Sequence, residues 1–516
     1  MQKTFKVLFL GAAVIVAGAS ETAVSSPPDG QESGNGGAIE AAKGAVAAAT
    51  ESFGAEDPQT LEATSRLISA YLDSENQTAA APLAKGLLAA LERQTPRNDA
   101  NISIVTGDVA QIKVFEGRFE EAEALFRRSL ELAEKAGGEN HVITALALNN
   151  LGAFLDEVDR SDEADPIMRR ALHIRERALG PTDRLTLQSL FSLGVIAMKQ
   201  QHMLLAEAIQ RQGLAMRREA NPPSLRSDIA ESQTELAKLL LVTGRSTEAV
   251  KLASEAVDNY AASFGPKHIR TMMTMHLKAD ALAADGREVE SDRLHRDLVA
   301  MIETLAPPQP ELLANALGDY GRHLVHAGQP ARAVEIHRRA VAISRAAHGE
   351  DQPDTVRLRR DLAESLYAHG EVAEAAKEGR EIVAALERAD GESVDTGAAL
   401  VSLGKYLLGD DGSKEARPLL RRAVTILEKS SGQSGLPTMQ ALSLLATSYV
   451  ATDDLQAAER VVDDAMSRYQ ADPDVRSMEM LGNIIGLRAV ILRKTGRSSE
   501  AEEAETIARQ IEADRR

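Results

Sequence analysis

Apolar residues recur along almost the whole chain with the three- and four-residue spacing of an amphipathic helix. Leu125, Leu130 and Leu132 mark the apolar side of one such segment, and arginine and glutamate residues occupy its opposite side. A second segment has the same pattern, with apolar positions at Ile167, Leu172, Ile174 and Leu179. This spacing places the apolar side chains on one helix face, and it predicts an all-α protein.

The helical segments belong to a unit that returns every 42 residues, within one residue. Its clearest copies are Gly-Arg-Phe-Glu-Glu-Ala at 117–122, Gly-Arg-Ser-Thr-Glu-Ala at 244–249 and Gly-Arg-Ser-Ser-Glu-Ala at 496–501. We call the first residue of each copy its anchor, and the anchors are Gly117, Asp159, Gln201, Gly244, Gly286, Gly328, Gly370, Asp411, Asp453 and Gly496. A degenerate eleventh copy fits at Glu75. A fixed period of this length predicts stacked units that bury their apolar faces against one another.

Small side chains occupy two fixed positions in each copy. Seven residues before the anchors stand only Gly and Ala, and five residues after them stands Ala in every copy except one, which has Ser291. Small residues allow two helix backbones to cross closely, so each copy is predicted to be a helical hairpin with the anchor at its turn. Glycine, and less readily aspartate, accepts the left-handed backbone of such a turn.

Proline and glycine mark the two ends of the second helix of the hairpin. Pro82, Pro166 and Pro418 each stand seven residues after an anchor, which predicts a place in the first turn of that helix. A glycine twenty-one residues after the anchor predicts a left-handed C-cap, at Gly138, Gly180, Gly265, Gly349, Gly391 and Gly432. The copy at Gln201 lacks a glycine turn, and the copy at Gly286 carries Ser291 and Leu298 in place of small residues. We expect these two copies to pack loosely or to bend the array.

This pattern resembles the tetratricopeptide repeat, and the 42-residue variant resembles the repeats of kinesin light chains. The clearest stretches are Leu-Asn-Asn-Leu-Gly at 148–152, the run at 163–180 and the run at 415–424. The resemblance covers residues 39–516 and implies a right-handed superhelical solenoid of about eleven hairpins. It is confined to the repeat and says little about the ligand.

The first residues have the pattern of an export signal. Lys3 and Lys6 precede a run of thirteen apolar and small residues from Val7 to Ala19, too few to span a bilayer comfortably. Residues 1–19 are therefore predicted to be a signal peptide cleaved after Ala19, with an uncleaved anchor as the alternative. Residues 20–38, rich in Ser, Pro and Gly, are predicted to form a flexible linker, and residues 39–516 the solenoid. We expect a periplasmic or secreted protein without a membrane span after cleavage.

Composition narrows the possible chemistry. A formal net charge of −18 argues against nucleic acid and against anionic membrane surfaces as partners. The chain has no Cys, no H-E-x-x-H pair, no G-x-S-x-G elbow and no Walker-type loop, so we expect neither catalytic residues nor a cofactor. A metal site at His323, His326 and His337, or a copper site at Met272, Met273, Met275 and His276, is conceivable. Solvated histidines and core methionines explain these residues more simply, and we predict no metal site.

The family resemblance also places a ligand groove. In this family the first helices line the concave wall, with groove residues thirteen, ten, six and three positions before the anchor. Transferred to this chain, those positions give Asn149, Lys238, His276, Asp280, Asn315, Arg322, Arg357, Arg360, Glu364 and Lys405. Arg322, Arg357, Arg360 and Lys405, with Lys238 further back, would form a basic stripe. Either these are solvated charges paired with residues such as Asp280 and Glu364, or the groove binds an acidic or carboxylate-bearing peptide.

The sequence as a whole indicates an exported, non-enzymatic scaffold that binds a peptide or protein in its concave groove, because a preordered array offers a large rigid surface. The alternative is a structural or self-associating envelope protein whose ends stack on neighbours. The charged last segment, residues 500–516, looks like a polar cap and argues against end-to-end growth. An enzyme acting on wall polymers has no supporting set of residues.

Overall fold

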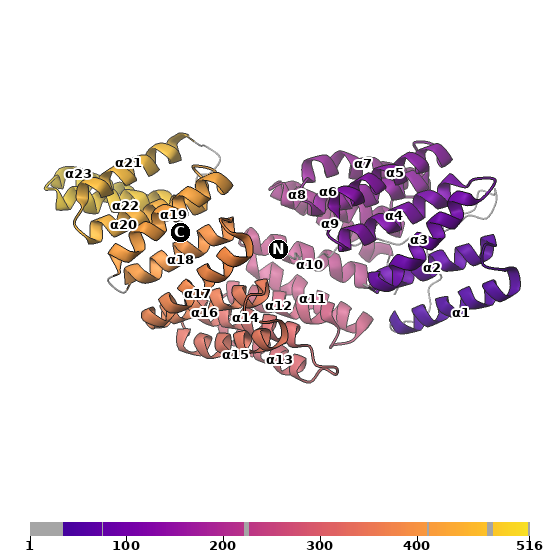
Figure 1. Cartoon of the computed structure of the whole chain (residues 1–516), viewed down its shortest axis with the longest axis horizontal. Helices are drawn as coiled ribbons and strands as arrows, with labels where there is room; N and C mark the ends of the chain where they lie inside the picture. Colours follow the sequence, from indigo (N-terminus) through magenta and orange to yellow (C-terminus); the bar gives the residue numbers. More distant parts are fainter. Residues whose placement is uncertain (1–34, 75, 221–225, 410–411, 472–477, 514–516) are drawn as a thin grey trace. The chain divides into compact units, whose positions relative to one another are not determined.

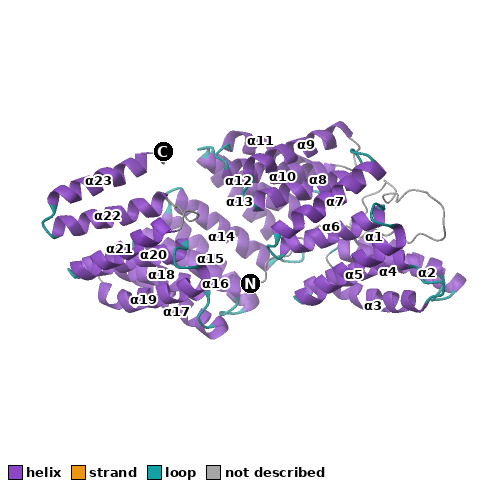
Figure 2. Ribbon diagram, turned by 90° about the horizontal axis from the view of Figure 1, so that it is seen from above, coloured by secondary structure: helices purple, strands orange, loops and turns teal. Residues whose placement is uncertain are grey.

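The described part of the chain consists of helices joined by short turns (Figures 1 and 2). The structure is a computed structural model, and it describes residues 35–74, 76–220, 226–409, 412–471 and 478–513. Helix α1 (Asn35–Phe53) precedes eleven helix pairs. The first helices of the pairs are α2 (Pro58–Asp73), α4 (Asp99–Phe115), α6 (Val142–Glu157), α8 (Arg184–Lys199), α10 (Arg226–Val242), α12 (Ile269–Ala284), α14 (Pro310–His326), α16 (Pro353–His369), α18 (Val394–Gly409), α20 (Leu436–Ala451) and α22 (Met478–Lys494). The second helices are α3 (Gln77–Arg93), α5 (Phe119–Gly137), α7 (Ser161–Leu179), α9 (Met203–Ala220), α11 (Ser246–Phe264), α13 (Glu288–Glu303), α15 (Pro330–His348), α17 (Val372–Asp390), α19 (Ser413–Ser431), α21 (Leu455–Ala471) and α23 (Ser498–Ala513).

The predicted left-handed turn is confirmed at every anchor that the structure describes. The values of φ run from 60° at Asp453 to 91° at Gly370. Gln201 adopts a φ of 62° without being glycine, so its hairpin keeps the common turn at a cost in backbone strain. Asp411 and the degenerate anchor Glu75 lie outside the described residues.

The glycines that follow the second helices also have positive φ, as predicted. Their ψ, however, is not that of the predicted left-handed helical conformation. At Gly138, Gly180, Gly265, Gly349 and Gly432 the value of ψ lies between 161° and 174°, far from the left-handed helical region. This combination of angles is almost exclusive to glycine. Glycine is therefore required more strictly at these caps than at the anchors.

Helix α1 is an element that the repeat count did not predict. It begins at Asn35, inside the stretch predicted to be linker, and it packs on α2. It ends at Phe53, and Gly54 after it has a positive φ of 90°, like the other cap glycines. Counting one period back from Glu75 gives α1 the position of a second helix. It covers α2, which would otherwise end the described array. The predicted signal peptide, residues 1–19, lies outside the described residues.

The prediction for the three prolines is wrong. Pro82, Pro166 and Pro418 are each the sixth residue of α3, α7 and α19, because these helices begin only two residues after the anchor. A proline there lies in the second turn, where it removes one main-chain hydrogen bond.

The two sets of small residues are buried between the paired helices. Ala110, Ala249 and Ala333 are fully buried examples. Where the position seven residues before the anchor is glycine, a longer side chain from the second helix fills the space. Met168 lies over Gly152 and Leu420 over Gly404, at 3.1 Å and 2.5 Å from the place that a Cβ atom would take. The predicted helix crossing is thereby confirmed.

The chain divides into two compact units, unit 1 up to Arg287 and unit 2 from Glu288. The division falls in the hairpin anchored at Gly286, which carries the unexpected Ser291 and Leu298. Among the described residues, no helix combines the length and the apolar character that crossing a bilayer requires.

Candidate functional site

The first helices of the hairpins form a wall in each unit. In unit 1, α4 contacts α6, α6 contacts α8 and α8 contacts α10. In unit 2, α14 contacts α16, α18 contacts α20 and α20 contacts α22. In the described part of the chain, successive second helices do not contact one another to this extent. Each unit therefore bends toward its first helices, and we call the surface of those helices its inner wall.

Charged residues of α14 and α16 form a linked set on the inner wall of unit 2. Arg322 donates from Nη1 to Oδ2 of Asp361 at 2.7 Å, and its Nη2 donates to Asp319. Arg357 lies 3.6 Å from the same Asp361 oxygen and donates to the amide oxygen of Asn315. Asp361 thus bridges two arginines from neighbouring hairpins, and the predicted residues Asn315, Arg322 and Arg357 lie together.

A second set joins α16 and α18. Lys405 donates to Glu364 at 2.8 Å, and the hydroxyl of Tyr406 donates to the other carboxylate oxygen at 2.9 Å. The Lys405 ammonium also lies 4.7 Å from the centre of the Tyr367 ring. Burial, and then the nearby Glu364 carboxylate, raise the pKa of Tyr406, so this hydroxyl remains a donor at neutral pH. The predicted residues Glu364 and Lys405 are therefore each other's partners.

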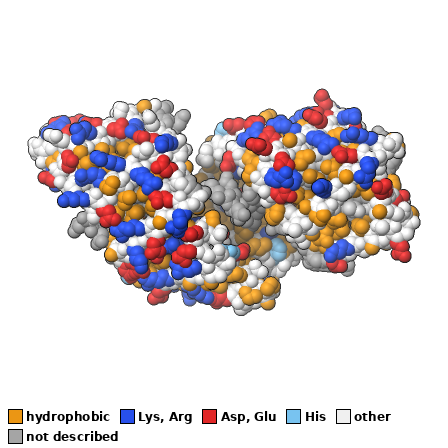
Figure 3. Space-filling view, viewed as in Figure 1, with side chains coloured by type: hydrophobic (Ala, Val, Ile, Leu, Met, Phe, Trp, Pro, Cys, Tyr) orange, Lys and Arg blue, Asp and Glu red, His pale blue; other side chains and the backbone are white. Residues whose placement is uncertain are grey.

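Every cation of the predicted stripe has an anionic partner. Arg360 lies 3.8 Å from Asp395, and Lys238 lies 2.6 Å from Glu235 in unit 1. Figure 3 likewise shows the basic and acidic side chains of unit 2 interspersed over the visible face. The wall thus fits the alternative in which its cations are paired with carboxylates. Most of those carboxylates are not the ones that were predicted. The clustering of cations therefore no longer argues for an acidic ligand.

Asn149, a predicted groove residue, is not at an open surface. Its side chain is 2% exposed, and its amide oxygen accepts from Arg175 at 3.1 Å and from Ser189 at 3.3 Å. Arg175 reaches it from α7 and also donates to the carbonyl oxygen of Leu185 at 2.9 Å. Burial lowers the pKa of Arg175 to about 10, so the guanidinium stays charged at neutral pH. Asn149 therefore helps to hold α7 against α6 and α8.

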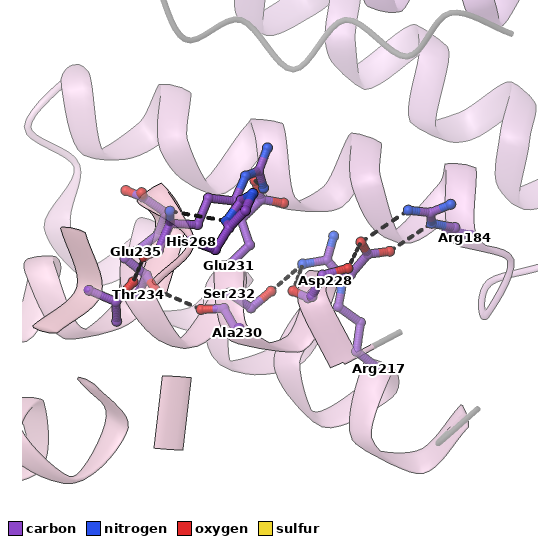
Figure 4. A network of polar contacts seen from close by, with 12 residues as sticks. Arg184, Arg217, Asp228, Ala230, Glu231, Ser232, Thr234, Glu235 and His268 are labelled. Atoms are coloured by element: carbon purple, nitrogen blue, oxygen red, sulfur yellow. Dashed lines mark hydrogen bonds and ion pairs between the residues drawn. The ribbon is translucent and has the colours of Figure 1, made fainter. Parts of the chain in front are cut away.

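The same bridge returns one period later (Figure 4). Arg217 of α9 donates to the carbonyl oxygen of Asp228 at 2.9 Å and to the hydroxyl of Ser232, both on α10. The Asp228 carboxylate accepts two hydrogen bonds from Arg184 of α8, at 2.8 and 3.2 Å. Arg175 and Arg217 both stand sixteen residues after an anchor. This recurring arginine is visible in the sequence and could have predicted the bridge, but it lies on a second helix, outside the groove positions.

Glu231 lies beside this bridge on α10, thirteen residues before Gly244. Its side chain is 14% exposed, and Arg270 lies 3.8 Å away. Figure 4 shows Glu235 of α10 and His268, at the start of α12, next to Glu231. Burial raises the pKa of Glu231 to about 7, although Arg217 and Arg270 act in the opposite direction. Glu231 stands thirteen residues before an anchor, which is one of the groove positions, but it was not among the predicted groove residues.

Two further predicted groove residues pair with each other on α12. His276 Nε2 lies 3.4 Å from Asp280 Oδ2, one helical turn away. Met272, from the conceivable copper site, is 3% exposed and belongs to the core of unit 1.

The histidines of the other conceivable metal site have separate surroundings. His337 is fully buried; Nδ1 lies 2.7 Å from the Ser365 hydroxyl, and Nε2 lies 3.1 Å from the Gly318 carbonyl oxygen. Burial lowers the pKa of His337, which favours the neutral ring. His323 is 7% exposed, whereas His326 is exposed at the surface. His337 uses both nitrogens to join α14, α15 and α16.

Comparisons with known proteins agree with this architecture. The tetratricopeptide-repeat family model matches residues 101–172 and 312–388. A search of curated proteins finds no match. The quorum sensor NprR from B. thuringiensis is similar at 12% identity, over 78% of this chain and 97% of that chain, with a TM-score of 0.51.

Two kinesin-light-chain-like structures are also similar. BtubC (BKLC) from P. vanneervenii shares 18% identity over 45% of this chain and 94% of that chain, with a TM-score of 0.38. A predicted kinesin light chain from Podosopora anserina with nearly identical TPR-like repeats shares 26% identity over 40% of this chain and 97% of that chain, with a TM-score of 0.35.

Proposed function

We propose that this chain, which is a tetratricopeptide-repeat protein, is an exported, non-enzymatic scaffold that binds a peptide or protein along its inner wall. A solenoid of this fold typically serves in protein interaction. The observation that carries the proposal is the inner wall, where successive rigid helices present polar side chains at the same repeat positions. Preordered side chains lose little conformational entropy on binding, which favours recognition.

The internal bridges support this proposal because they fix the helices that carry the wall. Arg175 and Arg217 are 1% and 2% exposed, and each joins three helices of unit 1. His337 does the same in unit 2. These buried side chains make their hydrogen bonds within the protein, so we assign them a positioning role.

The test is a selection of short random peptides displayed against the purified protein, followed by titration calorimetry with the selected peptides. Saturable binding with a negative heat-capacity change is expected, because binding buries apolar surface. Arg322→Glu and Arg422→Glu form a matched pair of variants. Both arginines are ion-paired and similarly exposed, at 43% and 41%, but Arg422 lies on a second helix.

A peptide that contacts the charged wall of unit 2 should lose affinity with Arg322→Glu and keep it with Arg422→Glu. Failure to select any saturable ligand would count against the scaffold proposal. The self-association alternative predicts instead a mass in solution that rises with protein concentration, measured by sedimentation velocity.

Export is a separate part of the proposal, supported by the basic and apolar pattern of residues 1–19. Cell fractionation followed by sequencing of the N-terminus tests it. A mature protein that begins at Ser20 outside the cytoplasm is expected, and an intact N-terminus on a cytoplasmic protein would contradict export.

A further inference from the structure

Two arginines of unit 2 stand apart from the charge pairing of the rest of the chain. Arg417 and Arg421 lie one helical turn apart on α19, the second helix of its hairpin (Figure 1). Arg421 is exposed and Arg417 is half-buried. In the described part of the chain, neither of them forms an ion pair with a carboxylate. In a protein with a formal net charge of −18, carboxylates are plentiful, so this isolation requires an explanation.

The equivalent positions of other hairpins carry a carboxylate and an arginine. The acid stands six residues after the anchor and the arginine ten residues after it, one turn further along the second helix. Four such pairs lie 2.7–3.2 Å apart: Glu123 with Arg127, Asp165 with Arg169, Glu207 with Arg211 and Asp292 with Arg296. In α19 the second position keeps its arginine, Arg421, but the first is Arg417. The charge at that position is reversed, and the carboxylate that would neutralise Arg421 is replaced by a second guanidinium.

A tyrosine of α20 contacts both arginines. The guanidinium carbon of Arg417 lies 4.2 Å from the centre of the Tyr449 ring, and Arg421 donates from Nη2 to the Tyr449 hydroxyl. Arg417 also donates from its Nη2 to the carbonyl oxygen of Ser448 at 3.2 Å. Other hairpins of unit 2 have a leucine at the position of Tyr449, namely Leu324, Leu366 and Leu407. The tyrosine therefore accompanies the reversed charge, and it holds the two guanidinium groups on one side of the hairpin.

The carboxylates that stand nearest to these residues in the sequence have partners of their own. These partners are Arg380 for Glu415 at 2.8 Å, Lys494 for Asp453 at 3.2 Å, and the main-chain N–H of Ala457 for Asp454 at 3.2 Å. A guanidinium has five N–H donors, and the Tyr449 hydroxyl engages only one nitrogen of Arg421. Because Arg421 is exposed, its remaining donors are accessible to a ligand.

The chemistry of the site selects an oxyanion. The planar fork of an arginine matches both carboxylate and phosphate groups, to which it donates two parallel hydrogen bonds. A carboxylate carries one negative charge, which one arginine balances. A phosphate group carries nearly two negative charges at neutral pH and offers three acceptor oxygens. Two guanidinium groups beside a hydroxyl therefore suit a phosphate group better than a carboxylate.

We propose that Arg417, Arg421 and Tyr449 form a binding site for a phosphate group, either the free ion or a group carried by a larger molecule. Both arginines lie on a second helix, so the site is separate from the inner wall. The inference goes beyond the proposed scaffold function and does not depend on it.

The experiment follows the binding of inorganic phosphate to the full-length protein by phosphorus NMR, at constant ionic strength because salt screens exposed charges. We expect saturable binding with a dissociation constant on the order of 1 mM, the equivalent of two charge-assisted hydrogen bonds. Arg417→Glu gives α19 the carboxylate–arginine pair of the other hairpins. This variant should keep the melting temperature of the wild type and bind phosphate about tenfold more weakly or worse.

Arg421→Gln provides a second variant, because Arg421 is exposed and its replacement should not disturb the fold. It should weaken phosphate binding to a similar extent. The matched control is Arg296→Gln, at the repeat position of Arg421 but beside Asp292, and it should leave the affinity unchanged. Equal phosphate affinity of the wild type, Arg417→Glu and Arg421→Gln would overturn the site.

Two further titrations of the wild type identify the ligand. Acetate should bind more weakly than inorganic phosphate, and tighter binding of acetate would overturn the assignment to phosphate. Phenyl phosphate distinguishes the two sources of the phosphate group. Tighter binding of phenyl phosphate than of the inorganic ion would assign the site to a phosphate group on a larger molecule, and equal binding would assign it to the free ion.

Discussion

The crossing of α18 and α19 offers a direct test of the packing. Gly404 stands where a Cβ atom would lie 2.5 Å from Cδ2 and 2.7 Å from Cγ of Leu420. Leu420 is fully buried, so it has no open space into which to move. Gly404→Ala should therefore introduce overpacking, which costs about 1–3 kcal/mol, against a gain of about 1 kcal/mol in helix propensity.

A double-mutant cycle of Gly404 and Leu420 measures this overpacking energy. Gly404→Ala alone should lower the free energy of unfolding by up to about 2 kcal/mol, and Leu420→Ala alone by about 2–5 kcal/mol. In the Leu420→Ala background the overpacking is gone, so Gly404→Ala should instead stabilise by about 1 kcal/mol. The expected coupling between the two sites is about 1–3 kcal/mol.

Hydrogen exchange of the α18 and α19 amides is the appropriate assay, because a repeat array can open locally. Gly486→Ala is the control, since a Cβ atom at that helical glycine meets nothing within 4 Å and should only stabilise. Equal effects of Gly404→Ala in the two backgrounds would show that Leu420 does not fill the space above Gly404.

Three further changes test other parts of the structure. Gln201→Gly removes a left-handed glutamine, with φ of 62°, and should raise the urea midpoint by the equivalent of about 1 kcal/mol; an unchanged midpoint would mean that the turn carries no strain. Glu231 has a folded pKa of about 7, above its unfolded value, so its contribution to stability is greatest at low pH and is lost as pH rises through 7. Glu231→Gln should therefore raise the melting temperature at pH 8 relative to the wild type but not at pH 5, and parallel melting curves at both values would contradict the assignment. Ala249→Leu should lower the free energy of unfolding by about 1–3 kcal/mol in urea titrations, because Ala249 is fully buried at the helix crossing, and an unaffected variant would place the crossing elsewhere.

The hairpins and their turns could be predicted because they depend on local properties that repeat. A left-handed turn favours glycine, which occupies six of the nine described anchors, so the repeat is visible in a single sequence. The same argument could have found α1, since Gly54 is one more cap glycine. The prediction failed for Pro166, because the repeat period does not tell how many residues separate the turn from the first residue of the helix.

The partners of the wall arginines could not be predicted, because they depend on neighbouring hairpins. Asp361 meets Arg322 across 39 residues of sequence and meets Arg357 within one helix turn. A list of groove positions identifies the arginines but not the carboxylates between them. Asn149 illustrates the converse, since the arginine that buries it, Arg175, comes from a second helix and lies outside the groove positions.

The paired charges of unit 2 should determine which partner binds more than how tightly it binds. A ligand that approaches unit 2 must exchange one ion pair for another, and such surface pairs are worth only about 0–1 kcal/mol each. The charge pattern of unit 2 would then discriminate among partners, because a partner with the wrong charges would leave a carboxylate or an arginine unpaired.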